Sequence, residues 1–207
     1  MFNDKFSIII PTLWKSQRIH KLLDDLTNCE SVGEIILIDN SNQFKQHYDL
    51  LPKTKVIIPS QNMFVSESWN FGIRSSKYNN IALCNDDINF NPHIFDIMLQ
   101  SEIIGIIGQA SDNYHYDYRE NLVMTPMIGI RPWGWGCLIF LKKEYWKEVP
   151  ENLKVWYGDD WLVKFNPIAK YTLHNFSIKT EMSSTSDLQK FNPIKEQDKL
   201  VWEQINS

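Results

Sequence analysis

The chain has 207 residues, 43% of them hydrophobic and 22% charged, which is ordinary usage for a globular domain with one full hydrophobic core. Its formal net charge of −4 argues against the broad positive field that binds nucleic acid, so we expect no nucleic-acid partner. Three scattered cysteines fit neither a disulfide framework nor a CxxC metal site, and no run of about 18 apolar residues predicts a transmembrane segment, so we expect a soluble, cytoplasmic protein.

Short β-branched runs alternate with amphipathic segments in the first half of the chain. We expect strands at 6–10, 34–38, 55–58 and 81–84, and helices at 16–26 and 65–76. In the first of these helices the apolar residues Ile19, Leu22, Leu23 and Leu26 recur at helical spacing. This order is typical of βαβ units and predicts an α/β fold with a mostly parallel central sheet flanked by helices.

The second half has a looser pattern. We expect a helix at 94–99, strands at 103–107 and 137–141, and a last helix at 193–205. The segment 109–118 is polar and rich in Tyr, and 183–186 is typical of a linker or mobile loop.

A cluster of polar residues, Asn85-Asp86-Asp87, directly follows the predicted buried strand at 81–84. In an open α/β sheet, ligands bind beyond the carboxyl ends of the strands. Adjacent carboxylates repel each other, and a divalent cation removes that repulsion while leaving coordination positions for phosphate oxygens. The cluster therefore indicates a metal site, with a solvated turn or helix cap before Pro92 as the alternative.

A second acidic pair, Asp159-Asp160, lies about seventy residues further on between aromatic residues. A carboxylate there could act as a general base that accepts a proton from an attacking hydroxyl. The alternative is a helix start, where acidic residues are common in the first turn.

Two further polar residues are candidates for binding. Asp39, after the strand at 34–38, could accept a hydrogen bond from the N–H of a uracil or thymine base, or could lie in a plain turn. His174 could complete a metal shell, since imidazole binds Mn-type ions, although a lone His is more often structural.

The segment 133–136 places Trp133 and Trp135 among glycines, which suits stacking on sugar rings; core packing against the sheet edge is the alternative. Arg131 could contact a phosphate or an acceptor, but we expect it on a solvated face.

Taken in order, these segments resemble the GT-A glycosyltransferases of the family 2 group, over residues 5 to 180. The resemblance is carried by the opening strand with Pro11-Thr12, the strand ending in Asp39, Gln61-Asn62 with the later Trp69-Asn70-Phe71-Gly72-Ile73, Asn85-Asp86-Asp87 at the DxD position, the segment 136–146, and Gly158-Asp159-Asp160-Trp161-Leu162 at the Glu-Asp motif. Asn85 replaces the first Asp of DxD, a form associated with the rhamnosyltransferase-like branch.

The resemblance implies a GT-A, Rossmann-like nucleotide-diphospho-sugar transferase fold and an inverting, metal-dependent transfer from a UDP- or dTDP-sugar to an acceptor hydroxyl, such as that of a glycan. It assigns donor binding to Pro11, Thr12, Asp39, Asn62, Asn70, Asn85 and Asp86, and Mn²⁺ or Mg²⁺ binding to Asp87 and His174. Asp160 would be the base, with Asp159 supporting the acceptor or exchanging roles with it.

We accordingly expect one domain over 1–207. It would comprise a nucleotide-sugar-binding half at 1–108, an acceptor and catalytic half at 109–180, and a C-terminal loop and helix at 181–207. A noncatalytic nucleotide-sugar-binding module would not need Asp159 and Asp160. A sugar nucleotidyltransferase would need a Gly-rich loop after the first strand, and 11–16 contains no glycine.

Overall fold

The computed structural model describes residues 4–41, 51–115, 121–181 and 189–207. The linker that we predict at 183–186 lies outside these ranges. None of the helices within them combines the length and the apolar character that crossing a bilayer requires. All three cysteines are buried.

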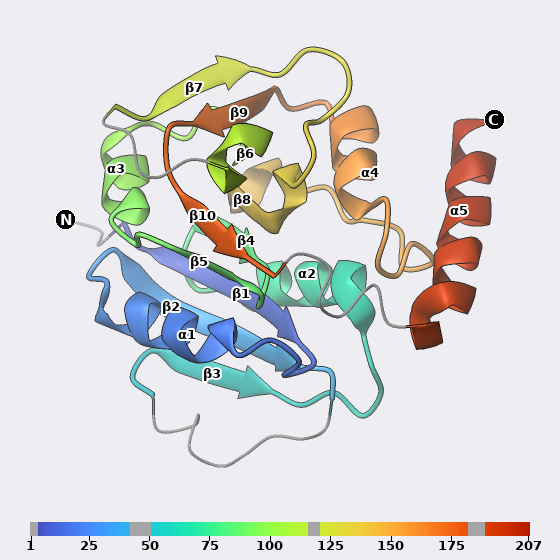
Figure 1. Ribbon diagram of the computed structural model, residues 1–207, viewed down its shortest axis with the longest axis horizontal. Coiled ribbons are helices and arrows are strands. Elements are labelled where there is room, and N and C mark those ends of the chain that lie inside the picture. The colour runs from blue at the N-terminus through green and yellow to red at the C-terminus, as the bar shows by residue number, and fades with distance from the viewer. Residues whose placement is uncertain (1–3, 42–50, 116–120, 182–188) are drawn as a thin grey trace.

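An eight-stranded sheet forms the centre of the molecule (Figure 1). Its strands, in spatial order, are β3 (Thr54–Ile57), β2 (Val32–Asp39), β1 (Phe6–Thr12), β4 (Asn80–Cys84), β8 (Leu138–Lys142), β6 (Ile106–Gln109), β9 (Lys170–His174) and β7 (Val123–Pro126). The first four run parallel, and β6 runs parallel to β9. Since β8 is antiparallel to both β4 and β6, it joins the two parallel groups into one sheet.

Helices cover both faces of this sheet because its central strands alternate their apolar side chains. In β1, Ile8 and Ile10 enter a core with α1 (Arg18–Asn28) and α3 (Ile94–Gln100). Ile9 enters the opposite core, with α2 (Phe64–Ser75) and α4 (Gly158–Phe165). The last helix, α5 (Asn192–Asn206), packs against this second core through apolar residues that include Trp202.

The close approach of α2 to the sheet depends on a glycine. A Cβ atom on Gly72 would lie 2.5 Å from Ile9 Cγ2, so only glycine lets the helix pack at this distance. The first turn of α2 is thereby fixed near the carboxyl ends of β1 and β2 (Figure 1).

The predicted fold class is confirmed, and so are the four strands of the first half and the helices between them. The strand that we predict at 103–107 begins later, since β6 spans Ile106–Gln109. Strands β7 and β9 are absent from our predictions, as is a small antiparallel sheet of β5 (Ile88–Phe90) and β10 (Ile178–Thr180). Short 3₁₀ helices occupy Ser111–Tyr114, Trp135–Cys137, Lys143–Tyr145 and Gln189–Phe191.

Candidate active site

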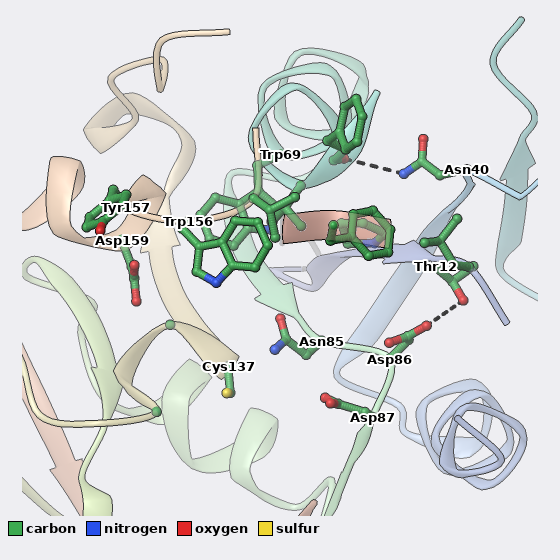
Figure 2. A pocket seen from close by; sticks show the side chains of 18 of the residues that line it. Thr12, Asn40, Trp69, Asn85, Asp86, Asp87, Cys137, Trp156, Tyr157 and Asp159 are labelled. Carbon is green, nitrogen blue, oxygen red and sulfur yellow. Dashed lines mark hydrogen bonds between the residues drawn. The ribbon is translucent and has the colours of Figure 1, made fainter. Parts of the chain in front are cut away.

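A cavity of about 360 Å³ opens at the carboxyl ends of β1 and β4. Ligands of open α/β sheets bind at this edge. One wall consists of residues at the ends of β1 and β4 and directly after them, and the opposite wall comes from the segment before α4 and the first turn of that helix (Figure 2). Seven of the predicted site residues line it: Pro11, Thr12, Asn62, Asn85, Asp86, Asp87 and Asp159.

Thr12 and Asp86 connect the ends of β1 and β4. The Thr12 hydroxyl donates a hydrogen bond of 2.6 Å to Asp86 Oδ2, drawn as a dashed line in Figure 2. The pKa of Asp86 is raised from 3.8 to about 6, because the effect of burial, with a smaller contribution from the neighbouring Asp87, exceeds the lowering effect of the bond from Thr12. This wall therefore carries two carboxyl groups close together in a largely buried position.

Asp87 is only 5% exposed and also lines the cavity, together with the amide of Asn85. The backbone N–H of Asn85 donates to the carbonyl of Cys137, 2.9 Å away, and this bond ties the loop after β4 to the beginning of β8. The wall thus presents carboxylate and amide oxygens, the ligand types that hard divalent cations bind.

Asp159 lies across the cavity, in the first turn of α4, with its carboxylate directed inward (Figure 2). Gly136 makes room for it, since a Cβ atom on Gly136 would lie 2.6 Å from Asp159 Oδ2. The pKa of Asp159 is raised from 3.8 to about 6, because burial, together with the charge of Asp160, outweighs the lowering effect of Arg131. A carboxylate with this pKa is ionised near neutral pH and is basic enough to take a proton.

Arg131 contacts both acidic residues of α4. Its Nε donates to Asp160 Oδ1 at 2.9 Å, its Nη2 donates to Asp160 Oδ2 at 2.8 Å, and its Nε also lies 3.0 Å from Asp159 Oδ2. Because both oxygens of Asp160 accept bonds from the guanidinium and Asp160 is not among the cavity-lining residues, Asp159 is the carboxylate presented to the cavity. Our expectation of a solvated Arg131 is wrong.

Asp39 ends β2 directly beside Thr12, its register partner in β1. Its carboxylate is fully buried: Oδ1 accepts bonds from the N–H and hydroxyl of Ser41, while Oδ2 has no hydrogen-bond partner within the described ranges. Leaving a buried oxygen without a donor costs about 1–3 kcal/mol, which a ligand donor would offset. Asp39 itself does not line the cavity, but the next residue, Asn40, does.

Two predicted site residues lie away from the cavity. Asn70 is buried and exchanges two hydrogen bonds with the backbone of Val149, so its amide is engaged in packing α2 against the loop before α4. His174 Nε2 lies 3.0 Å from Thr125 Oγ1, between the paired strands β9 and β7, and its Nδ1 lies 3.6 Å from Asp112. The contacts of His174 are thus with the side chains of Thr125 and Asp112, and His174 is not among the residues that line the cavity with Asp87.

The oxygen ligands at the cavity fit a divalent cation that is coordinated partly by the protein and partly by the substrate. Across residues 4–41, 51–115, 121–181 and 189–207, no group of three His, Cys, Asp or Glu side chains could hold a metal ion. Divalent cations such as Mg²⁺ are commonly bound through one or two carboxylates, with the remaining ligands supplied by water and substrate phosphates. Asp87, with Asn85 and Asp86 beside it, fits this kind of site.

The cavity also contains residues that the sequence analysis did not single out. Trp156 and Tyr157 form the wall next to Asp159, and Asn40 lies near the start of α2 (Figure 2). Asn40 accepts a bond from Met63 N and donates to Ser68 Oγ. The aromatic residues around the second acidic pair were a signal of this wall, whereas the polar contacts of Asn40 follow only from the packing of α2.

Comparison with known proteins shows the fold and no closer relationship. No protein-family model and no curated protein sequence matches the chain. Among solved structures, TarS 1–349 from S. aureus superposes with a TM-score of 0.63 at 14% identity, over 93% of this chain and 65% of that one. The same protein in complex with UDP gives 0.62 at 13% identity, over 95% and 64%.

GalNAc-T7, in a structure with UDP, GalNAc and Mn²⁺, gives a TM-score of 0.58 at 11% identity, over 85% of this chain and 43% of that one. The chain thus spans less than two thirds of the length of each of these neighbours. These neighbours are GT-A glycosyltransferases, and the chain shares their α/β fold.

Proposed function

We propose that the chain is a glycosyltransferase that moves a sugar from a nucleoside diphosphate, UDP or dTDP, to an acceptor hydroxyl of a glycan. The observation that carries this proposal is one cavity with the oxygen ligands of Asp87 on one wall and the inward-facing Asp159, with its pKa raised to about 6, on the other. Transfer from a diphosphate needs both parts: charge stabilisation at the leaving group and a base at the attacking hydroxyl. The shared GT-A fold supports it.

On the donor side, we assign the nucleobase to Asp39. The buried Oδ2 of this residue needs a donor, and the ring N–H of uracil or thymine is one. Pro11, Thr12 and Asn62 would line the path of the nucleotide from there to the diphosphate. Asn62 Oδ1 accepts a bond from Phe64 N, 2.7 Å away, so this side chain is held at the start of α2.

The diphosphate would lie at the Asp87 wall, where Asp87 and Asn85 would hold Mn²⁺ or Mg²⁺. Such an ion supplies Lewis-acid stabilisation of the negative charge on the departing diphosphate. The chain's own contribution is to hold the ligand oxygens in a buried position, where their charges act strongly. His174 is not part of this assignment.

On the acceptor side, we assign the base to Asp159. The acceptor oxygen attacks the anomeric carbon, the bond from that carbon to the phosphate oxygen breaks, and the hydroxyl proton passes to the Asp159 carboxylate. The bonding electrons leave with the diphosphate, and the configuration inverts in a single displacement. Arg131 holds Asp160 with both oxygens occupied, so Asp160 would orient Arg131 in place of taking the proton.

The first test is calorimetric titration of UDP, dTDP and GDP, and then of their sugars including dTDP-rhamnose, with Mn²⁺ and with EDTA. Metal-dependent binding of a uridine or thymidine diphosphate is expected, and the sugar series would test the rhamnosyltransferase-like branch. No binding of any nucleotide would overturn the proposal. Binding of a nucleotide sugar with neither transfer nor slow hydrolysis of the donor would indicate a noncatalytic module.

The substitution Asp159→Asn tests the base. It should lower kcat by roughly 10²–10⁴-fold, as loss of a general base does, and leave UDP affinity within about twofold, because this residue lies on the wall opposite the diphosphate. Asp160→Asn is the matched control and should cost much less. A larger loss in Asp160→Asn would return the base to Asp160.

A further inference from the structure

The C-terminal helix carries an acidic residue in an unusual environment. Asp198 of α5 is 0% exposed, while its neighbours along the helix are exposed or half-buried. Burying a carboxylate costs several kcal/mol unless hydrogen bonds replace its hydration. The hydrogen bonds that Asp198 accepts must therefore replace its hydration.

Those partners are three successive backbone N–H groups of one segment. Asp198 Oδ1 accepts from Lys154 N at 2.9 Å, and Oδ2 accepts from Val155 N at 2.8 Å and from Trp156 N at 2.9 Å. Bonds from N–H to a carboxylate are among the stronger hydrogen bonds in proteins. One side chain thus satisfies every backbone donor in this stretch and fixes its path.

The same segment is held from its other side. The carbonyl of Lys154 accepts bonds from Val65 N and Ser66 N in the first turn of α2, at 2.9 and 3.2 Å. The Tyr157 ring stacks on Trp202 of α5, with centroids 5.4 Å apart and planes at 9°. Tyr157 also has a φ of 66°, a left-handed conformation that costs a non-glycine residue energy and persists only where its surroundings enforce it.

This segment leads directly into the site. Val155, Trp156 and Tyr157 line the cavity, and Asp159 follows two residues after Tyr157 (Figure 2). Figure 2 shows Trp156 on the same side of the cavity as Tyr157 and Asp159, so its indole forms part of that wall. A shift of this segment would move the Trp156 wall and Asp159 together.

We propose that Asp198 is a positioning residue for glycosyl transfer, which acts through the backbone of residues 154–156 to fix Trp156 and Asp159 relative to the donor. This inference rests on the proposed function. Misplacement of a reacting group by about 1 Å can cost roughly 100-fold in rate. Loss of the Asp198 hydrogen bonds should therefore lower kcat more than it lowers nucleotide affinity.

The test compares Asp198→Asn with Glu196→Gln, the same chemical change on an exposed residue of the same helix. In Asp198→Asn, kcat at saturating donor and acceptor should fall at least tenfold per folded molecule, with UDP affinity within twofold of wild type. Amide hydrogen exchange of the 154–156 segment should accelerate, and Glu196→Gln should change neither quantity. If Asp198→Asn does not fold, Asp198→Glu decides, since it keeps the carboxylate and moves its oxygens by one methylene away from the three backbone N–H groups.

Wild-type kcat in either folded variant would overturn the inference. So would a fall in kcat that UDP affinity and the folded fraction match, because a merely structural role lowers all three together. A wild-type chain that neither transfers nor hydrolyses a donor would refute the proposed function before any substitution is made, so the two failures can be told apart.

Discussion

Arg131 forms ion pairs with two carboxylates, Asp159 and Asp160, and the two contacts differ in geometry. With Asp160 it forms a bidentate ion pair of two hydrogen bonds, and with Asp159 it makes a single contact of 3.0 Å. The rigid fork of a guanidinium favours the two-pronged arrangement, which holds Arg131 in place. The remaining contact lowers the pKa of Asp159 against the effect of burial, so Arg131 sets the pH at which this carboxylate becomes a base.

The pH dependence of transfer should therefore follow Arg131. In the wild type the rate should fall as the pH decreases through about 6, where Asp159 takes up a proton. Arg131→Met removes the cation that favours the ionised form, so the fall should move to higher pH. The pH profile of kcat/KM checks this. Arg74→Met removes an exposed arginine that also contacts two carboxylates and should leave the profile in place; a profile unmoved in Arg131→Met would contradict the prediction.

At the residue scale, the sequence predicts the site where residues follow strands. Asp86 and Asp87 could be placed because strand ends of a parallel sheet meet at one edge, whereas Thr12 was indicated by the resemblance to GT-A glycosyltransferases. Asn70 could not be placed, since its side chain bonds to a backbone 79 residues away and nothing in the local pattern reveals that partner. The three bonds of Asp198 were equally hidden, because they join residues more than forty positions apart.

At the element scale, prediction succeeded where a buried strand is a continuous apolar run. The strands β1, β2 and β4 are of this kind, with nearly every residue buried. By contrast β7 and β9 contain half-buried and polar residues, and β7 ends in a proline. These two strands at one end of the sheet form because β6 offers β9 a partner and β9 in turn pairs with β7, and that pairing is a property of the tertiary structure.

The packing of α2 on β1 allows a direct test at this scale. Gly72→Ala should destabilise the chain by about 1–3 kcal/mol, because a methyl group would collide with Ile9, and this outweighs the gain of roughly 1 kcal/mol in helix propensity. Urea unfolding measures the difference. Ser75→Ala, at a half-buried position of the same helix, should be near neutral. A stabilised Gly72→Ala variant would show that the helix can move away from the sheet without cost.

At the scale of the whole molecule, the site reduces stability at neutral pH. A carboxyl group whose pKa is higher in the folded state binds its proton more tightly when folded. For Asp159, raised from 3.8 to about 6, the stabilising contribution is therefore complete below pH 3.8 and is lost as the pH rises through about 6. The charge that Asp159 would need as the proposed base therefore opposes folding.

Asp159→Asn should accordingly stabilise the chain at pH 8, by up to about 3 kcal/mol for a shift of about two pKa units. The gain should fade below pH 6 and be nearly absent at pH 4. Arg131 keeps its pair with Asp160 in this variant, so no cation is left unpaired. Thermal unfolding at both pH values decides, with the exposed Asp24→Asn as control, and a variant less stable than wild type at pH 8 would contradict the argument.

The bonds between α5 and the 154–157 segment also bear on how the protein is made. A ribosome delivers the sheet strands before it delivers Asp198, so the eight strands can pair while the wall beside Asp159 still lacks its anchor. On this account the sheet of a nascent chain forms first, and the wall beside Asp159 is completed last. Under the proposed function, transfer would then begin only once α5 has emerged.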